Sequence, residues 1–163
     1  MNLRFRSSRG QALVEFALIL PLIFVLSVNA VNFGGFFFAW ITVANAARTG
    51  ATYWTAGPLS NGAPSRPTSA QVQAVVTKDV SSLLNKASVV ITACNNNNGA
   101  TDCGFVPPND PEAASYSVGV VDVSYTYKPL IPLFNFGRLG ISVGFFPAAG
   151  VQVHRRAVMR VMS

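Results

Sequence analysis

Residues 10–28 read GQALVEFALILPLIFVLSV, an apolar run with one charged side chain, Glu15. From residue 16 to residue 47 the chain carries no Asp, Glu, Lys or Arg. This uncharged stretch exceeds the roughly 20 residues that an α-helix needs to cross a bilayer. The helix of a soluble domain seldom stays uncharged for so long. We therefore predict one membrane-spanning helix with its transmembrane part at about residues 16–41, ending among aromatic residues that favour the membrane interface.

The charges on either side of this segment predict its orientation. Arg4, Arg6 and Arg9 precede the apolar run, whereas Arg48 is the one cation close behind it. Positively charged flanks stay on the cytoplasmic side of a membrane. We therefore expect a single-pass protein of the inner (cell) membrane, with a cytoplasmic N-terminus and an extracytoplasmic C-terminal domain.

A cleaved signal peptide is the alternative for this segment. Its apolar core would be about 7–15 residues long and would lead to an Ala-x-Ala cleavage site. Ala44-Asn45-Ala46 matches that site, but it lies far downstream of the apolar core. Glu15 and Pro21 are also unusual near the start of a signal core, so a membrane helix is favoured.

Glu15 needs a physical reason, because a carboxylate in hydrocarbon costs several kcal/mol unless it is paired or near water. It can lie among the lipid headgroups, which requires no function. It can complement the positive N-terminal end of a helix that starts near Gln11. It can also pair with a free amine at Gln11 of a neighbouring copy, if the chain is cut after Gly10. All three explanations stay open.

The third explanation is where a family resemblance enters. The cleavage region of type IV pilins and pseudopilins is similar to the start of this chain, which has a basic leader, then Gly10, then residues 11–16. In that family a prepilin peptidase cuts after the glycine, and the fifth mature residue is glutamate. More narrowly, RGQALVEFALILPLIF resembles the TadE/TadG-like minor pilins of tight-adherence (Flp) pilus systems. Residues 10–21 are similar to the signature of that family, which is a glycine, small residues, Val-Glu-Phe-Ala-Leu and a proline. The likeness is close over residues 1–52 and loose over residues 116–162.

The resemblance implies a TadE-like minor pilin or pilus assembly subunit that takes part in pilus biogenesis, adhesion or secretion. It implies processing by prepilin peptidase at Gly10 and Gln11, and helix assembly through Glu15, Phe16 and Pro21. The implied partners are other pilins, the inner-membrane pilus assembly machinery, the peptidase and the lipid bilayer. The alternative function is that of an uncleaved single-pass membrane anchor in an envelope or secretion complex.

Two further features of the apolar helix have two explanations each. Pro21 lacks an amide hydrogen and weakens the bond to the Ala17 carbonyl, so it can let a pilin helix bend. It can equally be a kink that a membrane helix tolerates. Gly34-Gly35 permits close helix approach, but we favour a flexible joint between the membrane part and the outer part of the helix.

The predicted organisation is a basic leader at residues 1–10, a helix at 11–54 and an extracytoplasmic domain at 55–163. The helix stripe that we expect to pack against a sheet is formed by Trp40, Ala44, Ala47, Ala51 and Trp54. Helical spacing places a polar stripe on the opposite side. It consists of Thr42, Asn45, Thr49 and Thr52.

The outer domain is predicted to be α+β and pilin-like, with one helix and a three-stranded antiparallel sheet. Thr68 and Gln71 form a capping box that starts the helix, which we expect to reach about Asn85. Its apolar face is formed by Val72, Val75, Val76, Val80, Leu83 and Leu84. The strands are expected at residues 87–94, 116–127 and 149–162, and the second is the strongest because its apolar and polar residues alternate. The aromatic residues before the last strand are expected in the core by default: Phe134, Phe136, Phe145 and Phe146.

Cys94 and Cys103 are predicted to form a disulfide. Both are expected outside the cytoplasm, where disulfides persist. A bridge across this short loop would stabilise the fold by about 2–3 kcal/mol. A redox pair would more often be Cys-x-x-Cys, and a zinc site needs further ligands.

We expect no enzyme, no cofactor, no metal site and no nucleic-acid partner. His154 is the one histidine, has Arg155 and Arg156 beside it and no acidic neighbour in sequence, and is interpreted as a strand-face side chain. Asp102, Asp110 and Glu112 lack the ligand spacing of a calcium loop. Without the three leading arginines the formal charge falls from +6 to about +3, and the remaining cations are dispersed rather than clustered as in a nucleic-acid patch.

Overall fold

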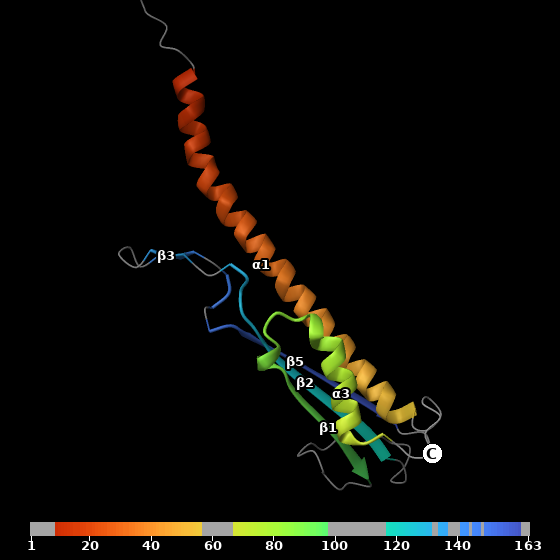
Figure 1. Cartoon of the computed structure of the whole chain (residues 1–163). Coiled ribbons are helices and arrows are strands. Elements are labelled where there is room, and N and C mark those ends of the chain that lie inside the picture. Colours follow the sequence, from red (N-terminus) through yellow and green to blue (C-terminus); the bar gives the residue numbers. More distant parts are fainter. Residues whose placement is uncertain are drawn as a thin grey trace, which may run out of the picture.

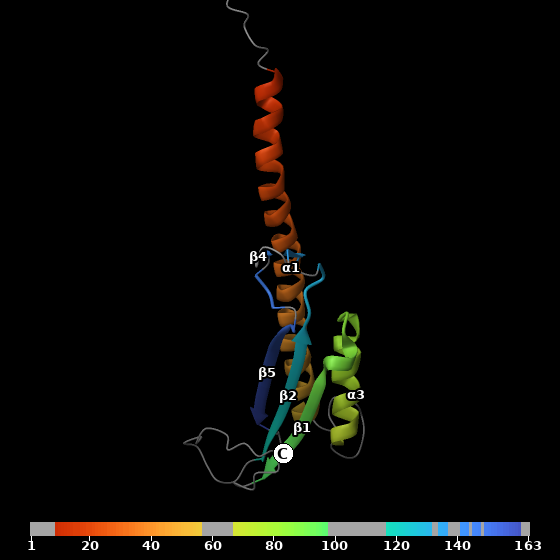
Figure 2. The same ribbon diagram turned by 90° about the vertical axis from the view of Figure 1, so that its left-hand side faces the viewer.

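One helix, α1 (Arg9–Ala56), runs through 48 residues without a break (Figure 1). At 1.5 Å per residue it is about 72 Å long. The computed structural model describes residues 9–56, 67–97, 117–131, 134–136, 141–143, 145–147 and 149–160. The second half of α1 packs against a small sheet, and the first half projects beyond it (Figure 2). The α+β class with a long N-terminal helix is confirmed.

Three strands form an antiparallel sheet in the order β1-β2-β5. They are β1 (Val90–Asn97), β2 (Ser117–Tyr127) and β5 (Val151–Arg160). β2 is central and matches the predicted strand to within one residue. Both α1 and α3 (Ser69–Asp79) contact one face of this sheet, with α1 on β2 and β5 and α3 on β1. No described helix covers the opposite face, here called the open face (Figure 2).

The core lies between the two helices and the sheet. Val121, Val123, Tyr125 and Tyr127 alternate along β2 and are all buried, as their spacing predicted. The α1 residues that face them are mostly small, so the helix backbone comes close to the sheet. A Cβ placed on Gly50 would lie 3.1 Å from Cγ1 of Val121 in β2 and 2.5 Å from Cγ2 of Val76 in α3, and the second distance is closer than real Cβ contacts allow.

The predicted apolar stripe of α1 is confirmed at its C-terminal end. Ala47, Ala51 and Trp54 are buried in the core. Trp40 is 40% exposed, because it lies at the edge of the sheet. There the Arg155 guanidinium is 3.7 Å from the centre of its ring, in a cation–π contact. On the opposite side of α1, the predicted polar residues Asn45, Thr49 and Thr52 are exposed and Thr42 is half-buried.

The start of α3 is as predicted, but its end is not. The Thr68 side chain accepts a hydrogen bond from the Gln71 amide, and the Gln71 side chain accepts one from the Thr68 amide. The helix ends at Asp79 rather than near Asn85, and a 3₁₀ turn, η1 (Val80–Ser82), follows. Leu83 then adopts extended backbone and is buried, which leaves Leu84 80% exposed.

The first strand also differs from its prediction of residues 87–94. Residues 86–88 form a second 3₁₀ turn, η2 (Lys86–Ser88), so β1 begins later and continues to Asn97. The Ser88 hydroxyl is close to the Asn85 and Thr126 carbonyl oxygens, which ties this turn to β2. The last strand spans residues 151–160 of the predicted 149–162, and Val161 and Met162 lie outside the described residues.

The connection between β2 and β5 contains a short hairpin that the sequence did not predict. It pairs β3 (Phe134–Phe136) with β4 (Ile141–Val143). The side chains of Phe134 and Phe136 lie outside the described part of the chain. The expected core position is confirmed for Phe146, which is buried, and is wrong for Phe145, which is 74% exposed. Phe146 packs inward against Phe36 and Tyr127, and the Phe145 ring lies on it from outside, with the two ring centres 5.7 Å apart.

Candidate assembly surface and its join to the domain

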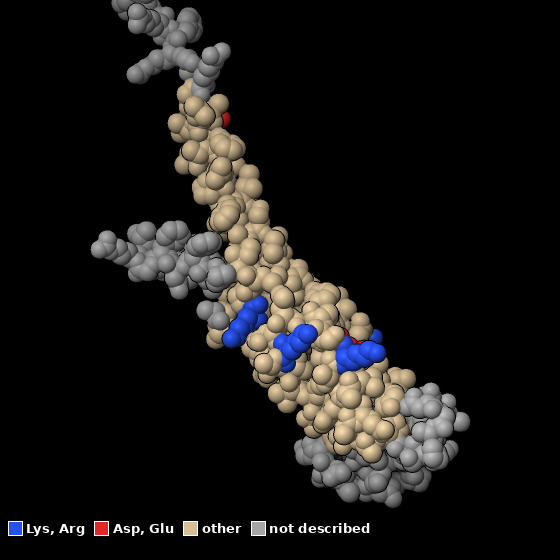
Figure 3. Space-filling model, in the orientation of Figure 1, with Lys and Arg blue, Asp and Glu red and all other residues tan. Residues whose placement is uncertain are grey.

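Residues 10–28 of α1 are here called the projecting segment. None of their side chains is buried by the rest of the described structure. Even large side chains are open, with Leu18 72% exposed. Helix α1 is long and apolar enough to cross a membrane by length and composition. On the face drawn in Figure 3, this part of the molecule shows no Lys or Arg. The segment therefore has the properties of a single-pass membrane anchor.

Gly10, Gln11 and Glu15 lie within the first turns of α1 and are all exposed. The Gln11 side-chain Nε2 donates a hydrogen bond to Glu15 Oε1 over 3.4 Å. A Cβ built on Gly10 would meet no atom within 4 Å. Packing within the described chain therefore does not explain a glycine at this position, and the Glu15 carboxylate faces outward from the molecule.

Phe16 and Pro21 occupy the same exposed segment. Phe16 is largely exposed, and Pro21 lies inside α1 without interrupting it. Proline still removes one amide donor, which weakens the helix at the Ala17 carbonyl. Ser27, further along, donates its hydroxyl hydrogen to the Ile23 carbonyl over 2.8 Å. This bond satisfies a polar group within the helix itself, as hydrocarbon surroundings require.

The projecting segment ends where two asparagines bind the domain. Asn32 donates to the Ile131 carbonyl and accepts from the Ile131 amide, each over 3.0 Å. One turn earlier, Asn29 accepts from the Phe145 amide over 3.1 Å and donates to the Val25 carbonyl over 2.9 Å. We call these contacts the asparagine join. They fix the loop after β2 and the segment before β5 to the same face of α1.

Tyr127 adds a third contact to the asparagine join. Its hydroxyl donates to the Asn32 main-chain carbonyl over 2.7 Å. Burial raises the pKa of the Tyr127 phenol, so it remains a neutral donor over the ordinary pH range. Close approach at this point depends on Gly35, where a Cβ would lie 2.7 Å from the Tyr127 hydroxyl. The helix is thus held to the domain at Gly35, and the predicted flexible joint is replaced by an unbroken, packed helix.

The sequence analysis missed the asparagine join, although a signal was present. Asn29 and Asn32 are three residues apart and share one face of an otherwise apolar helix. The join also divides the transmembrane part predicted at residues 16–41. Ala39, for example, is 2% exposed and belongs to the domain core. Of the described residues before Asn29, none is buried in the domain core.

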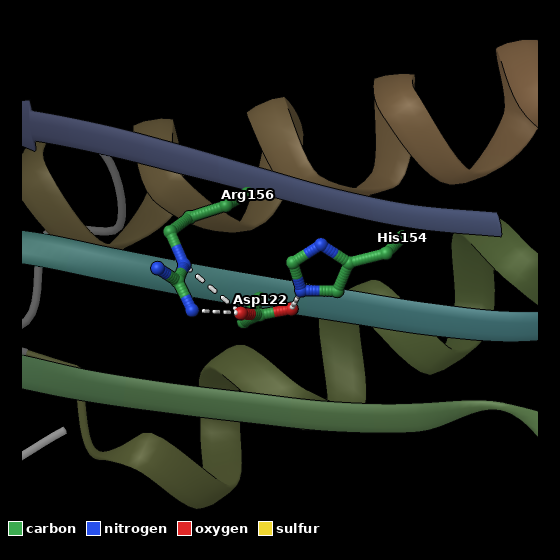
Figure 4. Close-up of polar contacts among 3 residues, drawn as sticks. All are labelled: Asp122, His154 and Arg156. Carbon is green, nitrogen blue, oxygen red and sulfur yellow. Dashed lines mark hydrogen bonds and ion pairs between the residues drawn. The ribbon is translucent and has the colours of Figure 1, made fainter. Parts of the chain in front are cut away.

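A polar cluster on the open face of the sheet was also missed. His154 Nε2 lies 2.6 Å from Asp122 Oδ1, and Arg156 donates to Asp122 Oδ2 through Nε and Nη2 over 2.9 and 2.7 Å (Figure 4). His154 is on the strand face, as predicted, and its side chain is 54% exposed. It does have an acidic neighbour, because Asp122 pairs with Arg156 across the strands and therefore lies beside His154. Figure 4 shows the three side chains on the side of the sheet away from the helices.

The other predicted sites depend on residues beyond those described. Cys94 is half-buried near the end of β1, and Cys103 lies outside the described residues, so their disulfide stays a prediction. Asp102, Asp110 and Glu112 also lie outside them. Within the described ranges, no group of three or more His, Cys, Asp or Glu side chains could hold a metal ion.

Residues 10–52 match the model of a protein family described as TadE-like protein. The matched range contains the projecting segment, the two asparagines of the join and most of the helix stripe in the core. No curated protein and no solved structure matches the chain significantly.

Proposed function

We propose, from the premise that this chain is a TadE-like protein, that it acts as a minor pilin or assembly subunit of a tight-adherence pilus system. The observation that carries the proposal is the projecting segment, an exposed apolar helix of bilayer length that is joined to a small folded domain. Such a helix can remain in a bilayer or pack among like helices, because both surroundings bury its apolar side chains. In this function the outer domain selects the other pilins and the assembly proteins that it meets.

The asparagine join supports a shorter crossing than residues 16–41. Loop backbone at Ile131 and Phe145 lies level with Asn29 and Asn32, and irregular backbone does not occur in lipid-exposed hydrocarbon. We therefore assign the crossing to residues 10–28, which span about 28 Å as a helix and match a hydrocarbon core of roughly 30 Å. Arg4, Arg6 and Arg9 then lie in the cytoplasm and the domain lies outside the inner membrane.

Processing by prepilin peptidase after Gly10 follows from the same proposal. Gly10 is exposed and has no packing role within the described chain, which is consistent with selection for recognition by a peptidase. Cleavage would give Gln11 a free amine. On a neighbouring copy that amine is a partner for the Glu15 carboxylate, whose charge is costly in hydrocarbon when unpaired. Phe16 and Pro21 would shape the packing of the helices.

The second candidate function is an uncleaved membrane anchor. The hydrogen bond from Gln11 to Glu15 favours it, because the carboxylate then has a partner within its own chain. We also propose that the chain is not an enzyme and uses no cofactor. The Asp122–His154–Arg156 cluster lies on an open sheet face, whereas catalytic sites are usually concave.

Mass spectrometry of the membrane-extracted protein separates the two candidates. In cells that hold the peptidase, the pilin function predicts an N-terminus at Gln11, whereas an intact N-terminus supports the anchor. Gly10→Ala should block cleavage. Gly34→Ala is the matched control, because it is also a helix glycine with nothing within 4 Å of its Cβ position.

Variants of Glu15 test the pairing with the new amine. Glu15→Gln removes the charge and should abolish incorporation into pili, while Glu15→Asp keeps the charge and should retain part of it. Membrane insertion should be equal for both variants, as checked by carbonate extraction. Normal incorporation of Glu15→Gln would disprove the pairing.

A further inference from the structure

Exposed apolar side chains gather where α1 enters the domain. We define the apolar collar as Phe33 and Phe37 of α1, Leu130 after β2, and Phe145 before β5. All four are exposed, and Phe145 is the most exposed of them. The Phe33 ring lies 5.3 Å from that of Phe37 and 5.5 Å from that of Phe145, between ring centres. Phe33, Phe37 and Phe145 therefore form a continuous patch from segments far apart in sequence, and Leu130 lies separately, beside Gly35 of the same helix.

Buried aromatic residues hold the apolar collar in place. The Phe146 ring is buried beside Phe145 and lies 5.3 Å from Phe36 and 5.6 Å from Tyr127. Tyr127 in turn binds the Asn32 carbonyl. The collar side chains thus project from a packed base, and their exposure is not a consequence of a loose loop. Contiguous exposed apolar patches of this kind mark protein or membrane contacts.

The position of the collar along α1 points to the membrane surface. If hydrocarbon ends before Asn29, as the crossing at residues 10–28 requires, Phe33 lies about 6 Å further along the helix. Phe145 is bound to Asn29 itself through its amide. The interfacial layer on each side of a bilayer is about 5–8 Å thick. The exposed rings of Phe33 and Phe145 therefore fall within that layer, and Phe37, about 12 Å beyond Asn29, lies just outside it.

The chemistry of the neighbouring surface agrees with this position. A groove of about 620 Å³ adjoins the collar at Leu130, where Phe38 and Leu84 also line it, and Lys128 is among its lining residues. No acidic residue is among the side chains that line this groove. Aromatic and aliphatic side chains beside a lysine are typical of surfaces that lie in the lipid interface, where the amine reaches phosphate.

We propose that the apolar collar docks into the outer interfacial layer of the bilayer, so that the membrane-bound chain holds its domain against the lipid surface in one orientation. This inference rests on the proposed membrane crossing and adds a second lipid contact to it. Because the collar and the crossing helix belong to one packed unit, insertion of the helix brings the collar to the headgroups without further rearrangement.

The test uses the full chain in vesicles of phosphatidylethanolamine and phosphatidylglycerol, with bromine on part of the acyl chains near the glycerol. Phe145→Trp places a fluorophore in the collar. Val158→Trp is the matched control, because Val158 is also exposed but lies near the far end of β5. The spectrum of the parent chain gives the background from Trp40 and Trp54. Bromine should quench most of the added emission in Phe145→Trp and none in Val158→Trp.

Three other outcomes overturn the proposal in distinguishable ways. If carbonate extracts the chain from the vesicles, the membrane crossing itself fails. If the chain stays inserted but the Phe145→Trp emission is quenched by iodide in the water and not by bromine, the docking of the collar is disproved and the membrane crossing stands. If Phe145→Trp becomes shielded only at high protein-to-lipid ratio, a second copy covers the collar instead of lipid. Leu130→Trp repeats the test should Phe145→Trp fold poorly.

Discussion

The two halves of α1 belong to one helix but have opposite surroundings. Before Asn29 most side chains are large, apolar and exposed, and after it the core-facing residues are mostly small, with Ala46, Ala47 and Ala51 buried. Large residues suit a surface whose partner is fluid lipid or another helix, whereas small ones let a sheet approach the helix backbone. The size of the apolar residues along α1 therefore distinguishes two surfaces. Large residues mark the part that is available to outside partners, and small residues mark the part that packs within the fold.

The largest expected effect comes from removing a large side chain from the packed half. Trp54→Ala should lower the free energy of unfolding of the domain by about 3–5 kcal/mol, because it leaves a cavity in the core. Phe16→Ala, in the projecting segment, should leave the domain unchanged. Denaturant unfolding of both variants in the same detergent checks this, and equal losses would contradict a division between the halves.

Two glycines of α1 give a second comparison. Gly50→Ala should cost about 1–3 kcal/mol, because its Cβ would lie 2.5 Å from Val76 Cγ2 and the core must shift. Gly34→Ala has free space at its Cβ position and should stabilise the helix by up to about 1 kcal/mol. Thermal unfolding of the pair should therefore move in opposite directions. A stabilised Gly50→Ala would show that the helix does not pack as closely on α3 as described.

The boundary between the halves can be weakened at Asn32. Asn32→Leu leaves the Ile131 amide and carbonyl without their partner and should cost about 1–3 kcal/mol. Hydrogen exchange at the Ile131 amide should accelerate in this variant. Asn45→Leu, at an exposed position of the packed half, is the control and should leave that amide protected. Unchanged exchange in Asn32→Leu would mean that the join does not hold the loop.

High pH should weaken the packed half through its tyrosines. Burial raises the pKa of Tyr125 and Tyr127 above the ordinary value of 10.0. Their folded forms therefore hold the phenolic proton more tightly than the unfolded chain does. Stability from this source is complete below about pH 10 and is lost as pH rises through the raised values. Unfolding titrations between pH 8 and 12 should show this loss, and Tyr127→Phe should reduce it; a flat profile would contradict it.

The smallest effect is expected on the open sheet face. Asp122→Ala removes the partner of His154 and Arg156, and it should change the free energy of unfolding by about 1 kcal/mol or less, because this cluster is partly exposed. The effect should shrink as salt is added. Unfolding at low and high salt measures it, and a loss of several kcal/mol would show that the cluster is structural to the core.

Local sequence patterns predicted the parts of the fold that depend on local rules. The alternation in β2, the capping box at Thr68 and the uncharged helix all follow from spacing and residue type. The end of α3 was wrong because a buried position for Leu83, set by the tertiary core, overrides the helical periodicity of the segment. Hairpin β3-β4 carries no alternation long enough to be recognised.

The candidate site was predictable in part for the same reason. Gly10, Glu15 and Pro21 are neighbours in sequence, so their common position on an exposed helix follows from the pattern. The asparagine join links residues 99 positions apart, and the Asp122–His154 contact depends on the register of two strands. The sequence of one segment does not predict which distant residue it will contact, nor the register in which two strands will pair.

The position of the bilayer along α1 is the central claim, and thiol labelling tests it most directly. Single cysteines at Val14, Leu18, Leu22, Asn45 and Thr49 would be exposed to a membrane-impermeant maleimide on spheroplasts, with the parent chain as background. The account predicts that the three positions in the projecting segment are protected and that Asn45→Cys and Thr49→Cys are labelled from outside. Labelling of Leu18→Cys or Leu22→Cys as fast as Asn45→Cys would contradict it.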